Sequence, residues 1–162
     1  MSEFFTTMDS PIGEIVLRSD GTSLTGVFTH GPKPKKLRTG EQNPDDKVLA
    51  KARKELTAYY AGTLKEFKVP LAPEGTLFQQ RVWRALLEIP FGETESYGQL
   101  ARRIGSPNAA RAVGLANGRN PIAIIIPCHR VIGSSGALVG YGGGLPRKKW
   151  LLEHEARFRA GV

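Results

Sequence analysis

The sequence "IAIIIPCHRVIG" (Ile122–Gly133) contains Cys128, the only cysteine of this 162-residue chain. The apolar run before Pro127 predicts a buried strand or an extended core segment, and the proline predicts its end. Cys128 should therefore lie on a turn at the edge of the core. A lone cysteine is most often a small buried hydrophobic residue. Here His129 and Arg130 follow it directly, and a base or a positive charge favours the nucleophilic thiolate.

The C-terminal segment predicts a partner for that histidine. The sequence after Pro146, "RKKWLLEHEARFRAG", has helical periodicity, and one face of the predicted helix combines a carboxylate with apolar residues, Glu155 with Leu151, Leu152 and Phe158. An unpaired carboxylate in an apolar stripe is unfavourable. We therefore expect Glu155 to orient His129, as a nucleophile–base pair requires. The alternative is a carboxylate at the rim of the stripe that reaches water. His154 is predicted to lie at the surface.

Between these two segments lies "GSSGALVGYGGGLP" (133–146), a glycine-rich stretch with one aromatic residue, Tyr141. It lacks the Lys-Ser/Thr ending of a phosphate-binding loop. An aromatic residue on a loop beside a nucleophile suggests a lid or a pocket wall. A plain connector remains the alternative.

The segment "SYGQLARRIGSPNAARAVGLANGRNP" (96–121) contains two helical patterns separated by a short break, as in a helix-turn-helix. Apolar residues of the first pattern recur at helical spacing, at Tyr97, Leu100, Ala101 and Ile104. Gly105 ends this helix, and Ser106 and Pro107 are suited to begin the next one. Four residues of the second helix are predicted to face inward, Ala109, Ala112, Val113 and Ala116.

The opposite face of the second helix carries Arg111, Gly114, Leu115 and Gly118. A glycine inside a helix costs about 1 kcal/mol relative to alanine. Two of them suggest that another surface approaches this face closely. That surface is either a nucleic-acid groove or a neighbouring helix, and the pattern alone leaves both open.

The preceding residues predict a β-rich N-terminal lobe, residues 1–72. The stretch "EIVLRSDGTSLTGVFT" (14–29) predicts two strands joined by a hairpin turn at Ser19–Gly21. After an exposed basic loop, a helix is predicted to start at Asn43–Asp46 and to end at Gly62. The stretch "FKVPLAPEG" (67–75) predicts one more short strand followed by a linker.

The second lobe, residues 76–162, opens with a capping box formed by Thr76 and Gln79, and its first helix is predicted to run to Pro90. The sequence therefore predicts an α+β fold, with a β-rich lobe followed by a helical lobe that contains a helix-turn-helix.

The charge is distributed unevenly. The net charge is +8; residues 1–75 hold 11 Lys/Arg and 10 Asp/Glu, whereas residues 76–162 hold 12 and 5. A basic, arginine-rich half favours a polyanionic partner such as nucleic acid, although a solvated charged surface has the same composition. No apolar run is long enough to span a membrane. One cysteine cannot form an internal disulfide, which fits a cytoplasmic protein. One cysteine and three scattered histidines have no metal-ligand spacing, so we expect no metal.

Four motifs, "PCHRVIG", "SYGQLA", "ARAVGLANGRNP" and "GYGGG…KKWLLEHE", together resemble the O6-alkylguanine-DNA alkyltransferases, also called methylated-DNA–protein-cysteine methyltransferases. The likeness runs from about Thr76 to Glu155 and extends weakly to "SPIGEIVL" (10–17). The resemblance implies a ribonuclease-H-like N-terminal lobe and a helical lobe with the reactive cysteine. It also implies direct DNA repair without a cofactor, in which the damaged guanine is flipped out of the duplex. Its O6-alkyl group then moves irreversibly to Cys128 in a single turnover.

The resemblance also implies roles for individual residues. Glu155 orients His129, which activates Cys128 through a water, and Asn120 shapes the turn that holds the site. Tyr97 crowds the target phosphate and donates a hydrogen bond or proton to the leaving guanine. Arg111 fills the space left by the flipped base, on a helix-turn-helix that approaches the minor groove.

Two further groups follow from the same resemblance. The residues expected to contact DNA are Tyr97, Ala110, Arg111, Ala112, Gly114 and Arg130. The residues expected to line the substrate pocket are Asn117, Val131, Ser134, Ser135, Tyr141 and Gly142.

The chain departs from the family pattern at two positions. Ala123 replaces a proline of some relatives, and Gly142 replaces a serine, which removes one hydrogen bond to the base. The N-terminal zinc and the regulatory domain of some relatives are not expected. The predicted partner is double-stranded DNA containing alkylated guanine, bound by a monomer, with cooperative binding along DNA left open.

Three other functions compete with alkyl transfer. A non-catalytic lesion-binding module, as in the alkyltransferase-like proteins, is disfavoured by Cys128, because those proteins replace this cysteine. A helix-turn-helix transcription factor would bind a specific sequence and ignore the lesion. A cysteine hydrolase would turn over many times.

Overall fold

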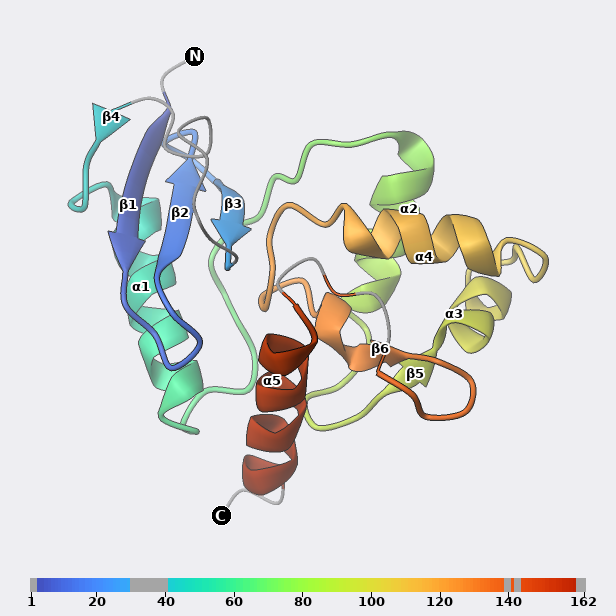
Figure 1. Ribbon diagram of the computed structural model, residues 1–162. Coiled ribbons are helices and arrows are strands. Elements are labelled where there is room, and N and C mark those ends of the chain that lie inside the picture. The colour runs from blue at the N-terminus through green and yellow to red at the C-terminus, as the bar shows by residue number, and fades with distance from the viewer. Residues whose placement is uncertain (1–2, 30–40, 139–140, 142–143, 160–162) are drawn as a thin grey trace. The chain divides into compact units, whose positions relative to one another are not determined.

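The computed structural model describes residues 3–29, 41–138, 141 and 144–159. The chain divides into two compact units, Met1–Glu74 and Gly75–Val162. Figure 1 shows a sheet with one helix in the first unit and mainly helices in the second. Each unit is described by itself.

The N-terminal unit contains a four-stranded sheet in the order β3-β2-β1-β4. Its strands are β1 (Phe4–Met8), β2 (Ile15–Ser19), β3 (Leu24–Phe28) and β4 (Glu41–Gln42). The first three are antiparallel neighbours, and β4 runs parallel to β1. The predicted hairpin turn after Ser19 is confirmed. The Asp20 carboxylate closes it by accepting hydrogen bonds from the backbone N–H groups of Thr22 and Ser23.

Helix α1 (Lys47–Tyr60) packs against this sheet through its apolar face, which comprises Val48, Leu49, Ala52, Leu56 and Tyr59. Its N-cap is Asp46, whose carboxylate accepts a hydrogen bond of 3.1 Å from the Leu49 N–H. The predicted start at Asn43 is therefore too early. Asn43 instead closes a turn before the helix, because its carbonyl accepts from the Asp46 N–H.

The short strand predicted within residues 67–75 is reduced to a single bridge. Leu71 forms only a single parallel bridge with Leu24, with hydrogen bonds from the Leu24 N–H to the Pro70 carbonyl (2.8 Å) and from the Ala72 N–H to the Leu24 carbonyl (2.9 Å). Pro70 has no N–H to donate, so the ladder cannot extend toward the residues before it.

The C-terminal unit contains four α-helices among its described residues, α2 (Leu77–Leu86), α3 (Tyr97–Arg103), α4 (Ala110–Gly118) and α5 (Leu145–Phe158). The predicted capping box at Thr76 is confirmed, and α3 has a second one, in which Ser96 and Gln99 cap each other. Helix α2 ends at Leu86 rather than at Pro90. Two short parallel strands, β5 (Glu95–Ser96) and β6 (Val131–Ile132), complete the unit.

Helix α4 starts later than predicted. Ser106 does not cap it; residues Ser106–Ala109 form a turn in which the Ala109 N–H donates to the Ser106 carbonyl. Gly105 ends α3 with a φ of +81°. The buried residues of α4 are Val113, Ala116 and Asn117, whereas Ala112, predicted to face inward, is exposed.

The four isoleucines of the apolar run Ile122–Ile126 are buried and Ala123 is half-buried, but the run is not a strand. The chain folds back on itself, because the Ile126 N–H donates to the Ile122 carbonyl and Ile124 has a φ of +71°. Asn120 stabilises this turn, since its amide donates to the Ile126 carbonyl at 2.8 Å and its Oδ1 accepts from the Ile122 N–H at 3.0 Å. Hydrophobicity predicted the burial correctly, but it cannot distinguish a strand from a compact turn.

Within the described part of the chain, no helix has both the length and the apolar character that crossing a bilayer requires.

Helices α2 and α4 are joined by a buried hydrogen bond from the Trp83 indole Nε1 to the Ala116 carbonyl (2.9 Å). Replacing Trp83→Phe removes this donor and leaves the Ala116 carbonyl only the 3.2 Å bond from the Arg119 N–H, so we expect the free energy of unfolding to fall by about 1–3 kcal/mol. Urea unfolding measures the change. In the control Leu77→Ala, whose side chain is 85% exposed, stability should change by no more than about 0.5 kcal/mol. Equal effects of the two variants would contradict this role of the indole.

Candidate active site

Cys128 begins a single turn of 3-10 helix, η2 (Cys128–Arg130), and is 6% exposed. Its backbone is held on both sides. The Cys128 N–H donates to the Ile126 carbonyl (2.8 Å), and the Cys128 carbonyl accepts from the side-chain amide of Asn117 (3.2 Å). The cysteine therefore lies at the edge of the core on a turn that is anchored to α4.

The predicted contact between His129 and Glu155 is present. His129 Nε2 lies 2.6 Å from Glu155 Oε2, and both side chains are buried. The other ring nitrogen, Nδ1, is also buried and has no hydrogen-bond partner among the described residues. Helix α5, which carries Glu155, packs against η2. The η2 turn thus supplies Cys128 and His129, and α5 supplies the Glu155 carboxylate that contacts His129.

Arg130 does not face solvent as a DNA contact would. It is 6% exposed, and its guanidinium donates to both oxygens of Glu155, from Nε at 2.8 Å and from NH2 at 3.0 Å. Its third partner is the carbonyl of Ile89, at 2.7 Å. The expectation that Arg130 contacts DNA is therefore corrected, because its donors are used inside the unit.

The charges around Glu155 determine its protonation and that of His129. Burial raises the pKa of Glu155, but His129 and Arg130 outweigh it and hold the pKa below its usual range. Burial lowers the pKa of His129, against the attraction of Glu155. An ionised carboxylate bound to Nε2–H leaves Nδ1 as the acceptor of a neutral imidazole. His129 is therefore in the form that can take a proton.

The thiol itself is held neutral. Burial raises the pKa of Cys128, although a hydrogen bond with Asn120 and the positive charge of Lys148 oppose the rise. Lys148 is fully buried, and its Nζ donates to the Val131 carbonyl at 2.5 Å. Burial also lowers the pKa of Lys148, against the charge of Cys128. No sequence pattern indicates a role for this lysine, because lysines are rarely buried and the "RKK" run is typical of a solvated helix surface.

Tyr97 lies at the first position of α3 and is half-buried. Burial raises its pKa, the charge of Cys128 adds to the rise, and a hydrogen bond with Asn117 opposes it. The phenol therefore stays protonated at neutral pH and can donate a hydrogen bond. Asn117, predicted as a pocket residue, is buried and connects Tyr97 to the Cys128 carbonyl.

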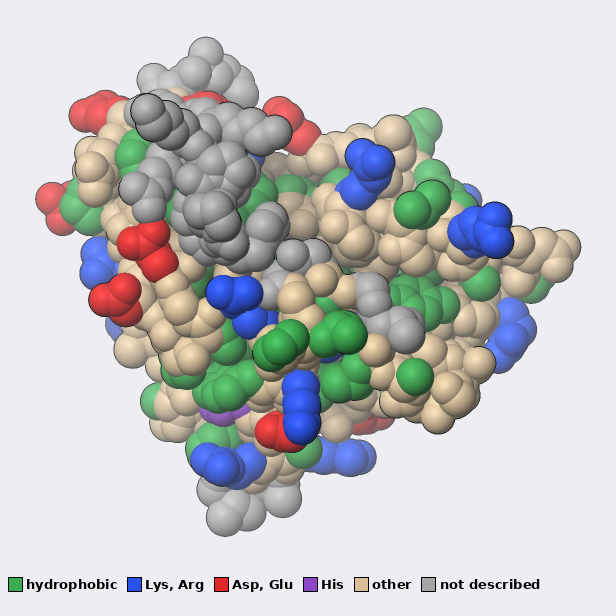
Figure 2. Space-filling model, in the orientation of Figure 1, with side chains coloured by type: hydrophobic (Ala, Val, Ile, Leu, Met, Phe, Trp, Pro, Cys, Tyr) green, Lys and Arg blue, Asp and Glu red, His purple; other side chains and the backbone are tan. Residues whose placement is uncertain are grey.

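The predicted DNA contacts on α4 lie on its accessible side. Arg111 and Ala112 are exposed, and Ala110 and Gly114 are half-buried. A Cβ at Gly114 would lie 3.8 Å from the Tyr97 ring, an ordinary contact, and a Cβ at Gly118 would meet no described atom within 4 Å. The neighbouring helices of this unit therefore do not require these glycines. In Figure 2 the surface over α4 carries basic and hydrophobic side chains, and no acidic residue occurs between Glu95 and Glu153.

The other residues predicted to line the substrate pocket lie in several different places. Val131 is buried in β6, directly after the η2 turn. Ser134 and Ser135 are exposed in a turn closed by the hydrogen bond from the Gly136 N–H to the Gly133 carbonyl. Tyr141 is half-buried, and Gly142 lies outside the described residues.

Glu155→Gln should be strongly destabilising, because it leaves the buried Arg130 without its counter-charge, at about 3–5 kcal/mol. Both Glu155 and His129 have a lower pKa in the folded chain than their ordinary values of 4.5 and 6.5. The unfolded chain therefore binds more protons in acid, and wild-type stability falls as the pH drops below about 6.5.

Urea unfolding at about pH 7, about pH 4.5 and about pH 3 measures both effects, and the variant should lose less stability below pH 4.5 than the wild type does. Glu153→Gln, an exposed neighbour on the same helix, is the matched control. A variant as stable as this control at neutral pH would refute the role of the buried pair.

Two family models match the chain. The 6-O-methylguanine DNA methyltransferase ribonuclease-like domain matches residues 4–73, and the DNA binding domain of the same family matches residues 77–157. The β-rich and helical units thus have the α+β architecture that the sequence predicts, with a ribonuclease-like domain first.

Curated relatives agree with these models. A Mycobacterium leprae protein named methylated-DNA–protein-cysteine methyltransferase is 56% identical over 149 residues, which are 92% of this chain and 90% of that protein. A protein of the same name from Methanosarcina acetivorans is 51% identical and covers 94% of this chain and 97% of its own length.

Solved structures give the same result. The structure of Mycobacterium tuberculosis OGT in complex with DNA has a TM-score of 0.88 and 54% identity, covering 96% of this chain and 94% of that one. These matches cover nearly the whole chain at high identity. The chain therefore belongs to the 6-O-methylguanine DNA methyltransferase family, the methylated-DNA–protein-cysteine methyltransferases.

Proposed function

We propose that this protein repairs DNA by moving the alkyl group of O6-alkylguanine to its own Cys128, once per molecule. Family membership supports the reaction class. The observation that carries the assignment is the buried series of Cys128, His129 and Glu155, in which Glu155 fixes Nε2 of the histidine and leaves Nδ1 as the acceptor.

The geometry supports a simple proton path. Because the resting thiol is neutral, it must lose its proton to react, and His129, acting through a water, takes it. The Cys128 sulfur then forms a bond to the alkyl carbon while the bond from that carbon to guanine O6 breaks. The leaving guanine carries the electron pair, and the protonated phenol of Tyr97 donates to it. The product is a thioether, which no group in the site can cleave, so each molecule acts once.

DNA would approach the α3–α4 pair, used as a helix-turn-helix, from the minor groove. The reacting oxygen is stacked and paired in a duplex, so the target nucleotide has to be flipped out. Arg111 is exposed on α4 and can fill the space it leaves. The accessible glycines of α4 allow the backbone to approach the groove.

We propose further that a monomer binds the lesion-containing duplex in the cytoplasm. Residues 1–72 form the β-rich lobe, and residues 76–162 form the domain that binds DNA and accepts the alkyl group. Asn117, Val131, Ser134, Ser135, Tyr141 and Gly142 line the base pocket, and Asn120 shapes the acceptor turn.

Intact-protein mass spectrometry after incubation with a duplex containing one O6-methylguanine tests the proposal. The wild type should gain the mass of one methylene at one-to-one stoichiometry, and Cys128→Ser should gain none. An unchanged wild-type mass with tight binding to the lesion would instead support a non-catalytic lesion-binding module.

Gly114→Ala separates the two interpretations of the glycine face. Alanine favours the helix by about 1 kcal/mol, and its Cβ makes only an ordinary contact with Tyr97. We therefore expect a more stable protein that binds lesion DNA several-fold more weakly, measured by thermal unfolding and by fluorescence anisotropy. Unchanged affinity for DNA would show that the groove does not approach this residue.

A further inference from the structure

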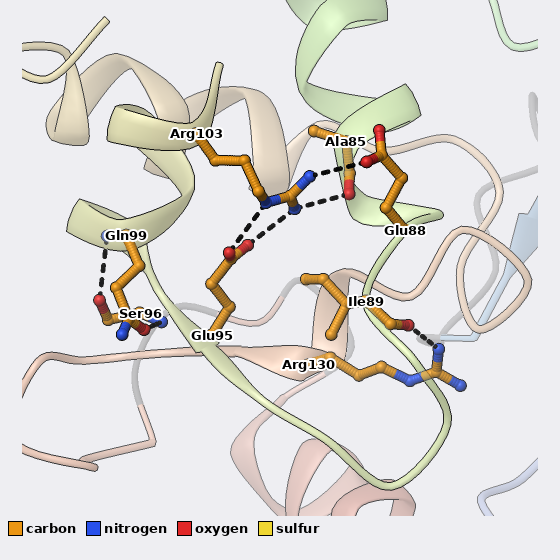
Figure 3. A network of polar contacts seen from close by, with 8 residues as sticks. All are labelled: Ala85, Glu88, Ile89, Glu95, Ser96, Gln99, Arg103 and Arg130. Atoms are coloured by element: carbon orange, nitrogen blue, oxygen red, sulfur yellow. Dashed lines mark hydrogen bonds and ion pairs between the residues drawn. The ribbon is translucent and has the colours of Figure 1, made fainter. Parts of the chain in front are cut away.

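Arg103, the last residue of α3, connects three elements of the C-terminal unit. Its guanidinium binds Glu95 through two hydrogen bonds, Nε to Oε2 at 2.9 Å and NH2 to Oε1 at 2.8 Å (Figure 3). The same guanidinium reaches the end of α2, where NH2 donates to the Ala85 carbonyl at 2.8 Å and NH1 lies 3.3 Å from Glu88 Oε2. Sequence periodicity gave no reason to single out this arginine.

Glu95 connects this arginine to both reacting ends of the site. It begins β5, and its backbone is paired with Val131, the residue that directly follows the η2 turn. It also lies two residues before Tyr97, and the Ser96 capping box fixes the step between them. The Arg103–Glu95 pair therefore ties the C-terminal end of α3 back to the strand from which Tyr97 emerges.

A second connection runs through the end of α2. The Ile89 carbonyl, next to Glu88, accepts a hydrogen bond from Arg130, which in turn binds Glu155 (Figure 3 shows the first contact). Arg103 thus binds the end of α2, and Arg130, which lies in the η2 turn with the cysteine, binds Ile89, the residue that follows Glu88. The two arginines connect the DNA-facing helices to the acceptor turn through short, direct contacts.

We infer that Arg103 is a positioning residue for the alkyl transfer, holding Tyr97 in register with the Cys128 turn through its ion pair with Glu95. This inference rests on the proposed function. The Arg103 side chain is 31% exposed and that of Glu95 18%, so the pair is partly solvated, and we expect the chain to remain folded without it. A small misplacement of a reacting group, in contrast, strongly slows a reaction that depends on alignment.

The test is the single-turnover rate of methyl transfer from O6-methylguanine duplex at saturating DNA, read by quenched-flow mass spectrometry. We expect Arg103→Gln to be about tenfold slower than the wild type, because Tyr97 loses its register. Arg103→Lys should recover only part of the rate, because an ammonium cannot bind Glu95 through two parallel bonds. Arg102→Gln, the same change at the adjacent exposed residue of α3, should leave the rate at saturation unchanged.

Two further readouts separate positioning from loss of structure. The rate at which iodoacetamide modifies Cys128 should be the same in Arg103→Gln and the wild type, because the acceptor turn itself is intact. Glu95→Gln should slow transfer as Arg103→Gln does, and the double variant should be no slower than either single one. The inference is wrong if Arg103→Gln and Arg102→Gln react equally fast, or if iodoacetamide modification changes in parallel with transfer. A wild type that gains no mass would overturn the proposed function itself.

Discussion

The buried carboxylate of Glu155 is the group on which the arrangement of the C-terminal unit depends. It is 1% exposed and receives hydrogen bonds from His129, from Arg130 and from the Gly92 N–H, which come from two different segments. A carboxylate removed from water is stable only with such partners. Helix α5, the η2 turn and the residues after α2 must therefore all be in place before Glu155 can be buried.

Arg130 has a specific effect in this arrangement. Burial is the main reason that the pKa of His129 is lowered, and the positive charge of Arg130 lowers it further, while Arg130 also helps to keep the pKa of Glu155 low. Lys148 adds a second buried cation, placed against the Val131 carbonyl and close enough to act on the Cys128 charge. The C-terminal unit thus has two kinds of basic residue. Arg130 and Lys148 are buried and act on the site, whereas others, such as Arg111 on the outer face of α4, are exposed.

The sequence predicted those features whose chemistry is local. The turn at Asp20 and the capping box at Thr76 depend on residues two or three positions apart, and both are confirmed. The contact of Glu155 with His129 was also predictable, because a carboxylate in an apolar stripe requires a partner. The compact turn at Ile124 was not, since it depends on the side chain of Asn120 rather than on hydrophobicity. The burial of Arg130 and Lys148 depends on carbonyl and carboxylate partners from distant segments, which no periodicity reveals.

The burial of Cys128 also has a consequence for its chemical lifetime. Oxidation to sulfenic and then sulfinic acid requires an accessible thiolate, and this sulfur is neither exposed nor readily ionised. Peroxide and other small electrophiles in the cell should therefore consume it slowly. For a residue that can accept only one alkyl group, such inertness preserves the protein until a correctly oriented lesion, with the base beside the thiol, makes deprotonation productive.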